Sequence, residues 1–158
     1  MLTALIAPLL VLAQGAQQPF PTKTTTLKRD GAVYTVEGRV RIPRSQTIVS
    51  LRYMKLKGIG EGGVLEVEGK LEMKAVTGGR VSIENVTIEL MPKCKEVALT
   101  SAEFTGSSGL RSSDAGPSAA KVYISATKFR GKAECDLKRS GGRVDMHMSH
   151  SDAPVRIT

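Results

Sequence analysis

Aromatic residues are scarce in this chain of 158 residues: they make up 4% of it, and there is no tryptophan. This scarcity argues against a sandwich built around a large aromatic side chain. Any core must instead consist of Val, Leu, Ile, Ala and Met stacked in layers. The apolar content of 41% is near that of ordinary globular proteins, so the composition is that of one packed domain and not of a disordered chain.

Amphipathic helices are also missing from the sequence. No window of useful length has apolar residues at the 3.6-residue spacing of a helix. From Tyr34 onward, apolar or glycine positions alternate with charged positions, most regularly in residues 36–42 and 67–73. A period of two is typical of β-strands, whose side chains point alternately to opposite faces. The sequence therefore predicts an all-β fold.

Internal repeats give the arrangement of these strands. Residues 31–42 resemble residues 62–73 at an offset of 31, and residues 97–106 match residues 122–131 at an offset of 25. Self-similarity of this kind indicates stacked units, none of which buries its apolar face alone. We therefore expect a short β-solenoid over residues 31–158, preceded by an irregular lead-in at 16–30. A β-jellyroll or sandwich is the alternative fold.

Five segments open with a valine that is followed two positions later by a second apolar residue; these valines are Val49, Val81, Val97, Val122 and Val144. If successive coils lie above one another in parallel, these positions form continuous internal columns. A second column is expected at the residues that follow four of the openers at a constant distance, namely Leu56, Ile88, Phe104 and Phe129. The interval between residues 81 and 97 is short for a full coil, which indicates a shortened side or a different register.

Three segments carry a resemblance to a known family. Residues 81–88 read Val-x-Ile-x-Asn-Val-x-Ile, and residues 97–106 and 122–131 read Val-x-Leu/Ile-x-x-Ala/Thr-x-Phe-x-Gly. This pattern resembles the repeats of right-handed parallel β-helices of the pectate-lyase-like superfamily, from about Val33 to the C-terminus. The resemblance implies a short, single-stranded, right-handed parallel β-helix. It also implies either a polysaccharide lyase or hydrolase, or a catalytically silent surface or adhesion protein.

A lyase of this kind would hold Ca²⁺ with grouped carboxylates, and a hydrolase would use two or three neighbouring aspartates. The offset of 31 residues would stack Glu37 on Glu68. Two stacked carboxylates can bind a cation, or they can be exposed groups that lie beside Arg39 and Lys70. The sequence leaves both interpretations open.

A second candidate site lies near the C-terminus. Asp145, His147 and Ser149 occupy alternate positions of one strand and share a face, which is the geometry of a local metal or acid/base cluster. Neighbours on one strand face are about 7 Å apart, too far for a serine to reach its base directly. An exposed polar row is therefore the alternative interpretation. The sequence predicts no catalytic residues, no metal and no cofactor.

Residues 1–15 form a short uncharged apolar run followed by small residues, as in a secretory signal, and the run is too short to span a membrane. The predicted location is therefore secreted, periplasmic or cell-surface. Export would permit a disulfide between Cys94 and Cys135. The offset of 25, however, places Cys135 over Leu110 as a small buried residue, so the sequence leaves the pairing open.

The net charge of +8 and the pI near 9.7 predict attraction to anionic partners. Lys and Arg alternate with apolar residues and do not cluster in the sequence. A nucleic-acid surface also requires stacking aromatics, and the tyrosines Tyr34, Tyr53 and Tyr123 are scattered, so no nucleic-acid partner is predicted. The preferred function is an exported, non-enzymatic protein that binds anionic polysaccharide weakly and in a salt-sensitive way. A carbohydrate-active enzyme and an envelope transport or assembly protein are the alternatives.

The last residues, 153–158, stop within an apparent strand that has no polar cap. An open strand edge invites pairing with another chain. We therefore expect either self-association through the C-terminal coil or a longer solenoid of which this sequence is a piece.

Overall fold

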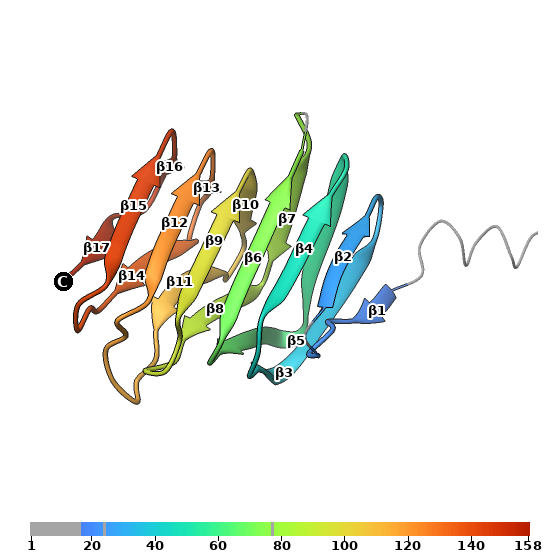
Figure 1. Ribbon diagram of the computed structural model, residues 1–158. Coiled ribbons are helices and arrows are strands. Elements are labelled where there is room, and N and C mark those ends of the chain that lie inside the picture. The colour runs from blue at the N-terminus through green and yellow to red at the C-terminus, as the bar shows by residue number, and fades with distance from the viewer. Residues whose placement is uncertain (1–16, 24, 77) are drawn as a thin grey trace, which may run out of the picture.

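The structure is a computed structural model that describes residues 17–158 except residues 24 and 77 (Figure 1). The predicted signal segment, residues 1–15, lies outside the described residues. Within the described part the protein has 17 β-strands and no helix. Every pairing between these strands is parallel. The predicted parallel β-solenoid is therefore confirmed, and the antiparallel jellyroll alternative is wrong.

Each coil contributes one strand to a six-stranded sheet, here called the small sheet. Its strands run in the spatial order β15-β12-β9-β6-β4-β2. They are β2 (Thr25–Arg29), β4 (Gln46–Ser50), β6 (Lys70–Ala75), β9 (Glu96–Thr100), β12 (Lys121–Ser125) and β15 (Arg143–His147).

The remaining strands form an 11-stranded sheet, here called the large sheet, which opposes the small sheet across the interior (Figure 1). Its first row contains β7 (Arg80–Glu84), β10 (Ala102–Thr105), β13 (Lys128–Phe129) and β16 (His150–Ser151). Its second row contains β8 (Val86–Leu90), β11 (Gly109–Ser112), β14 (Glu134–Leu137) and β17 (Val155–Ile157). In the first coils β3 (Val33–Ile42) and β5 (Tyr53–Val67) run through both rows, and β1 (Gln17–Pro19) pairs with β3.

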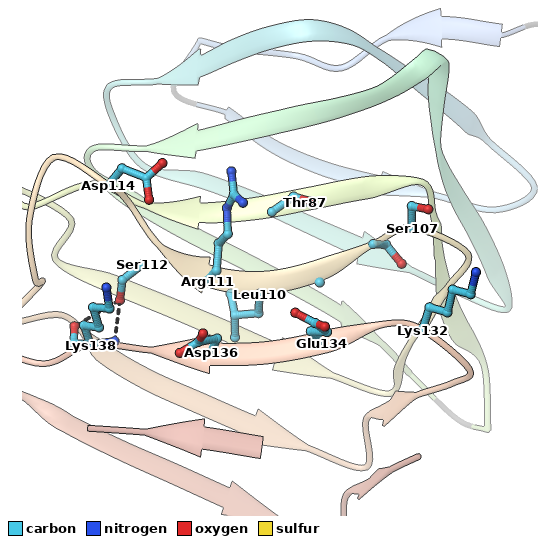
Figure 2. Close-up of a pocket in the computed structure, with 12 residues that line it drawn as sticks. Thr87, Ser107, Leu110, Arg111, Ser112, Asp114, Lys132, Glu134, Asp136 and Lys138 are labelled. Carbon is cyan, nitrogen blue, oxygen red and sulfur yellow. Dashed lines mark hydrogen bonds between the residues drawn. The ribbon is translucent and has the colours of Figure 1, made fainter. Parts of the chain in front are cut away.

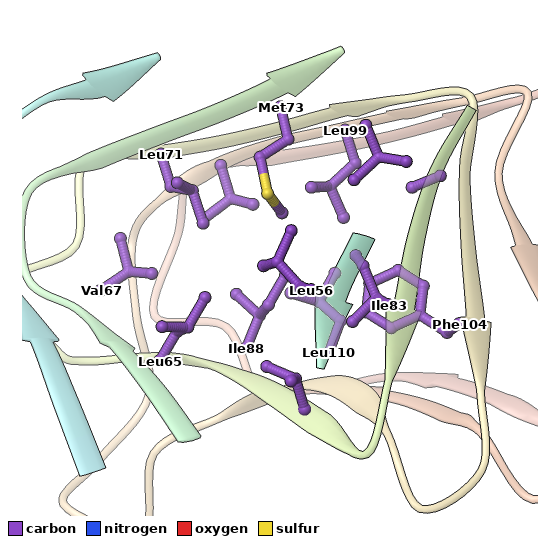
Figure 3. Close-up of a cluster of buried hydrophobic side chains, with 14 of the residues drawn as sticks. Leu56, Leu65, Val67, Leu71, Met73, Ile83, Ile88, Leu99, Phe104 and Leu110 are labelled. Carbon is purple, nitrogen blue, oxygen red and sulfur yellow. The ribbon is translucent and has the colours of Figure 1, made fainter. Parts of the chain in front are cut away.

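The core is built from columns of inward-facing side chains, one residue per coil (Figure 3). One column runs through Leu65, Ile88, Leu110 and Cys135, all fully buried. Another runs through Leu56, Ile83, Phe104 and Phe129. The two phenylalanine rings stack with centroids 4.6 Å apart and an interplanar angle of 12°. The predicted layered aliphatic core with stacked phenylalanines is therefore present.

The predicted register is confirmed in the C-terminal half of the chain. Val97 pairs with Val122 and Val122 with Val144, and Cys135 pairs with Leu110. In the N-terminal half the predicted register is wrong, because Val81 belongs to the large sheet, where it pairs with Met54 and Ala102. Ile88 likewise belongs to the column of Leu65 and Leu110. The alternating pattern is the same on every side of a coil, so it does not reveal to which side a strand belongs.

The predicted stacking of Glu37 on Glu68 is also wrong. Glu37 pairs with Ile59, and the backbone N–H of Glu68 donates to the carbonyl of Ile42. The register between β3 and β5 shifts at Gly38, because β5 carries extra residues between Ile59 and Gly63. The true offset is therefore 22 residues before this bulge and 25 after it.

The segment 16–30 also differs from the expected irregular lead-in. It contains β1 and β2, and β2 pairs with β4 along its whole length. Phe20 is buried and packs edge-on against Tyr34, with ring centroids 6.2 Å apart. The stacked strands thus begin before the predicted start at residue 31. Pro19 and Pro21 interrupt the alternating pattern in the sequence, but the strands on either side of them still pair with the next coil.

Candidate functional site

Solvent-accessible basic residues line one corner of the solenoid, where the second row of the large sheet turns into the small sheet. We call this feature the basic corner. It consists of Arg44, Lys70, Lys93, Lys95, Lys121, Lys138, Arg139 and Arg143. The acidic residues at or beside the same corner are Glu68, Glu96, Asp114 and Asp145. The corner is therefore strongly cationic over most of the length of the solenoid.

Backbone hydrogen bonds fix the spacing of the basic corner. The N–H of Lys95 donates to the carbonyl of Gly69 (2.8 Å), and the N–H of Lys121 donates to the carbonyl of Lys95 (3.0 Å). Successive coils are therefore separated by the usual strand spacing, about 4.8 Å. Position 69 must be glycine, since a Cβ there would lie 2.8 Å from the backbone of Arg44 and Pro43.

Most cations of the basic corner lack an acidic partner. Lys70 pairs with Glu96 at 3.4 Å, and Arg143 pairs with Asp145 at 2.8 Å. Within residues 17–158, the other six members form no ion pair with an acidic side chain. Arg44, Lys70 and Lys95 also line a shallow hollow of about 280 Å³. The charge of the six unpaired members is thus available to an anionic partner.

A larger hollow, here called the outer hollow, lies on the outer face of the second row next to the basic corner (Figure 2). Its volume is about 370 Å³. Its charged lining consists of Arg111 on β11, Glu134 and Asp136 on β14, Lys132 at one end, and Asp114 and Lys138 at the other. Gly109 forms part of the floor, where a Cβ would lie 2.5 Å from the carbonyl oxygen of Glu134. The hollow is therefore open to solvent, polar and of mixed charge.

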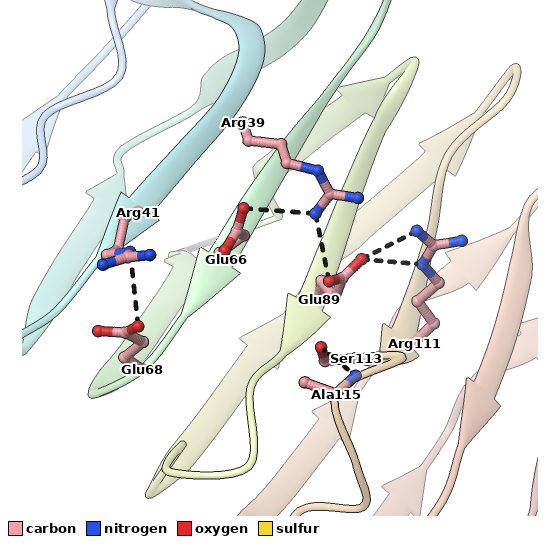
Figure 4. A network of polar contacts seen from close by, with 8 residues as sticks. All are labelled: Arg39, Arg41, Glu66, Glu68, Glu89, Arg111, Ser113 and Ala115. Carbon is pink, nitrogen blue, oxygen red and sulfur yellow. Dashed lines mark hydrogen bonds and ion pairs between the residues drawn. The ribbon is translucent and has the colours of Figure 1, made fainter.

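Beside the outer hollow, a buried carboxylate is held by two arginines (Figure 4). The Nε and Nη2 atoms of Arg111 donate to Oε2 of Glu89 at 3.2 and 2.9 Å. Nη1 of Arg39 donates to Glu89 at 3.4 Å and to Glu66 at 3.3 Å. The hydrogen bond to Glu66 and the charge of Glu89 raise the pKa of Arg39. This network fixes Arg111 on the side away from Asp136.

The structure only partly brings together the predicted group of Asp145, His147 and Ser149. Asp145 forms an ion pair with Arg143, and β15 ends at His147. Met148 adopts a positive φ of 50°, so the chain turns before Ser149. Ser149 Oγ donates to the carbonyl of His147 (3.0 Å) and accepts from the N–H of Thr127 (3.3 Å). Ser149 therefore bonds to the backbone at the turn after β15 and does not form a cluster with Asp145 and His147.

The predicted carboxylates Glu37 and Glu68 have separate environments. Glu37 is exposed on β3, and Glu68 pairs with Arg41 at 3.4 Å. Among the described residues no group of three His, Cys, Asp or Glu side chains could hold a metal ion.

One pair that sequence reasoning did not select is His150 and Asp152, whose Nε2 and Oδ1 atoms lie 3.0 Å apart. Asp152 also accepts the N–H of Gly131 at 2.9 Å. This backbone hydrogen bond, followed by the one from His150, lowers the pKa of Asp152. The signal available in the sequence was the spacing of two residues between a histidine and an aspartate. The pair links neighbouring coils on the exposed surface.

Cys94 and Cys135 do not form a disulfide, and both are buried. Burial raises the pKa of each thiol to about 12. Neither residue is therefore a nucleophile in the folded protein at neutral pH, because the thiolate is the reactive form.

The fold and these surfaces define a class: a parallel β-solenoid of six coils with a cationic corner. The described residues include no helix that is both long and apolar enough to cross a membrane. Comparison of the chain with protein-family models, curated proteins and solved structures finds no match.

Proposed function

We propose that the protein is an exported, non-enzymatic solenoid that binds anionic polysaccharides along its basic corner. The supporting observation is the alignment of solvent-accessible cations at one edge of a regular stack. Lys70, Lys95 and Lys121 lie in successive coils, which are about 4.8 Å apart, and Lys95 directly precedes Glu96, the residue in register with Lys70 and Lys121. Arg44 extends the row in the coil that precedes Lys70. An extended polymer with repeated acidic groups can contact several of these cations at once.

The expected affinity is modest and sensitive to salt. Each exposed ion pair contributes about 0.2–1 kcal/mol, so binding requires several contacts along the corner. Interactions between exposed charges are screened over about 10 Å at 0.1 M ionic strength. Raising the salt concentration should therefore weaken binding steeply.

The test reverses charge at two different corners of the solenoid. The double variant Lys95→Glu/Lys121→Glu changes the basic corner. The matched control Arg52→Glu/Lys128→Glu makes the same change in net charge at exposed positions near another corner. Binding of heparin fragments and polygalacturonate is measured by calorimetry at low salt. We expect a loss of at least about tenfold in the first variant and a much smaller loss in the control. Equal losses would show that overall charge, and not the corner, determines binding.

A second candidate function is polysaccharide hydrolysis in the outer hollow. Glu134 and Asp136 lie two residues apart on the same face of β14, which places them about 7 Å apart along the strand. This spacing is within the roughly 6.5–9.5 Å between the carboxyl groups of inverting glycosidases. Release of reducing ends from acidic polysaccharides tests this function. Turnover that is lost in Glu134→Gln or Asp136→Asn would replace the binding proposal.

Self-association through the C-terminal coil is a further proposal. Met148, Val155 and Ile157 are exposed apolar side chains of this coil. Sedimentation over a range of protein concentrations tests it. A mass that increases with concentration would support association, and a monomer at all concentrations would contradict it.

A further inference from the structure

We infer that the outer hollow selects, among anionic polysaccharides, those that also carry free amino groups. The inference rests on the proposed function, because the polymer is first held by the basic corner. Lys138 belongs to both the basic corner and the lining of the hollow, so a chain bound along the corner passes the hollow.

The carboxylates of the outer hollow are available for a ligand. Asp114, Glu134 and Asp136 line it, and none of the three forms an ion pair or a side-chain hydrogen bond within the described part of the chain. Glu134 and Asp114 are exposed, and Asp136 is half-buried. These carboxylates thus have no direct ionic partner, although Lys132 and Lys138 line the same hollow.

Asp136 would be expected to pair with Arg111, its neighbour in register on β11. Both Nε and Nη2 of Arg111 donate to Glu89 on the opposite side, at 3.2 and 2.9 Å (Figure 4). Arg156, the neighbour of Asp136 on β17, forms no ion pair with it either. The buried Glu89 therefore leaves Asp136 free for a positive group of a ligand.

The arrangement of charge determines the class of ligand. Lys132 and Lys138 lie at opposite ends of the hollow, with Glu134 and Asp136 between them (Figure 2). A polymer with acidic groups alone would place negative charge against these carboxylates. A polymer with an ammonium group between acidic groups would match both the lysines and the carboxylates.

The hollow also has space for a sugar unit. Its volume of about 370 Å³ lies in the range of roughly 300–1,000 Å³ that is usual for small-ligand sites. Gly109, one of the lining residues, carries no side chain, and a Cβ there would lie 2.5 Å from the carbonyl oxygen of Glu134 on the neighbouring strand.

The test compares two probes that differ only in the amino group. N-desulfated heparin fragments carry free amines, and N-acetylation of the same fragments removes those positive charges and keeps the acidic groups. We expect the wild-type protein to bind the free-amine fragments about 3–10-fold more tightly, as two exposed ion pairs allow. In the variant Glu134→Gln/Asp136→Asn this preference should disappear. In the basic-corner variant Lys95→Glu/Lys121→Glu, both probes should bind more weakly and the preference should remain.

The outcomes separate this inference from the proposed function. If both probes bind the wild-type protein equally, or if the preference persists in Glu134→Gln/Asp136→Asn, the inference is wrong while the proposed function stands. If neither probe binds, both are wrong. Circular dichroism and urea unfolding of each variant exclude loss of the fold as the cause.

Discussion

At the scale of single residues, the buried Glu89 joins two arginines on the outer face of the second row. Its side chain is 4% exposed and accepts hydrogen bonds from Arg39 and Arg111. We expect Glu89→Gln to reduce the free energy of unfolding by about 1–3 kcal/mol, because hydrogen bonds between charged groups are lost. Urea denaturation measures this change.

Glu68 provides the matched control for Glu89. Its ion pair with Arg41 is 3.4 Å long, and the two side chains are 29% and 66% exposed. Solvent screening makes such a pair worth at most about 1 kcal/mol. Glu68→Gln should therefore have a small effect. If both variants lost equal stability, the burial of Glu89 would not be the cause.

The two thiols give a prediction about pH. Burial raises the pKa of Cys94 and Cys135 from 9.0 to about 12. Because the folded pKa exceeds the unfolded one, the stabilisation is complete below about pH 9 and is lost as the pH rises toward about 12. Near neutral pH, iodoacetamide should leave both thiols of the folded protein unmodified and should alkylate both in urea, as mass spectrometry would show. Rapid alkylation of either thiol in the native protein would contradict the described burial.

At the scale of elements, stability depends on contacts between neighbouring coils. Phe129 on β13 is fully buried and stacks on Phe104 of β10. Phe129→Ala should lower the free energy of unfolding by about 3–5 kcal/mol, because it removes a core ring and leaves a cavity. Tyr123→Ala, on the exposed face of the same coil, should change it by less than about 1 kcal/mol. Chemical denaturation of both variants compares them, and similar losses would argue against the ring stack as a major contact.

The sequence predicts the strands and the stacking, but only part of the register. The offset of 25 residues correctly pairs Val97 with Val122, because each of these coils has three strands and regular corners. The stronger similarity at an offset of 31 is misleading, since it matches different sides of two coils. The bulge in β5 at residues 60–62 changes the offset between paired residues of β3 and β5. In the sequence, the glycines of this segment suggest an ordinary turn between two strands.

The candidate site was harder to predict because its residues are distant in the sequence. Arg44, Lys95 and Lys138 belong to different coils, and only the true register brings them to one corner. In the sequence their charges alternate with apolar residues and suggest a generally solvated face. The outer hollow depends further on the direction in which Arg111 points, which no spacing rule provides.

At the scale of the whole molecule, a solenoid should not be uniformly stable. Each coil contacts only its neighbours, so local opening is easier where a coil has fewer of them. In β9 the inward residues Val97 and Leu99 are fully buried and strands pair on both sides. In β15 the inward residues Val144 and Met146 are only partly buried.

Amide hydrogen exchange can measure this gradient. We expect the amides of β6 and β9 to exchange at least about tenfold more slowly than those of β15, because their opening disrupts contacts with two coils. A ligand bound along the basic corner spans several coils, so it should slow exchange most in the less stable coils. Uniform protection from β2 to β15 would show that the stack opens as one cooperative unit, and nearest-neighbour contacts would then not limit its stability.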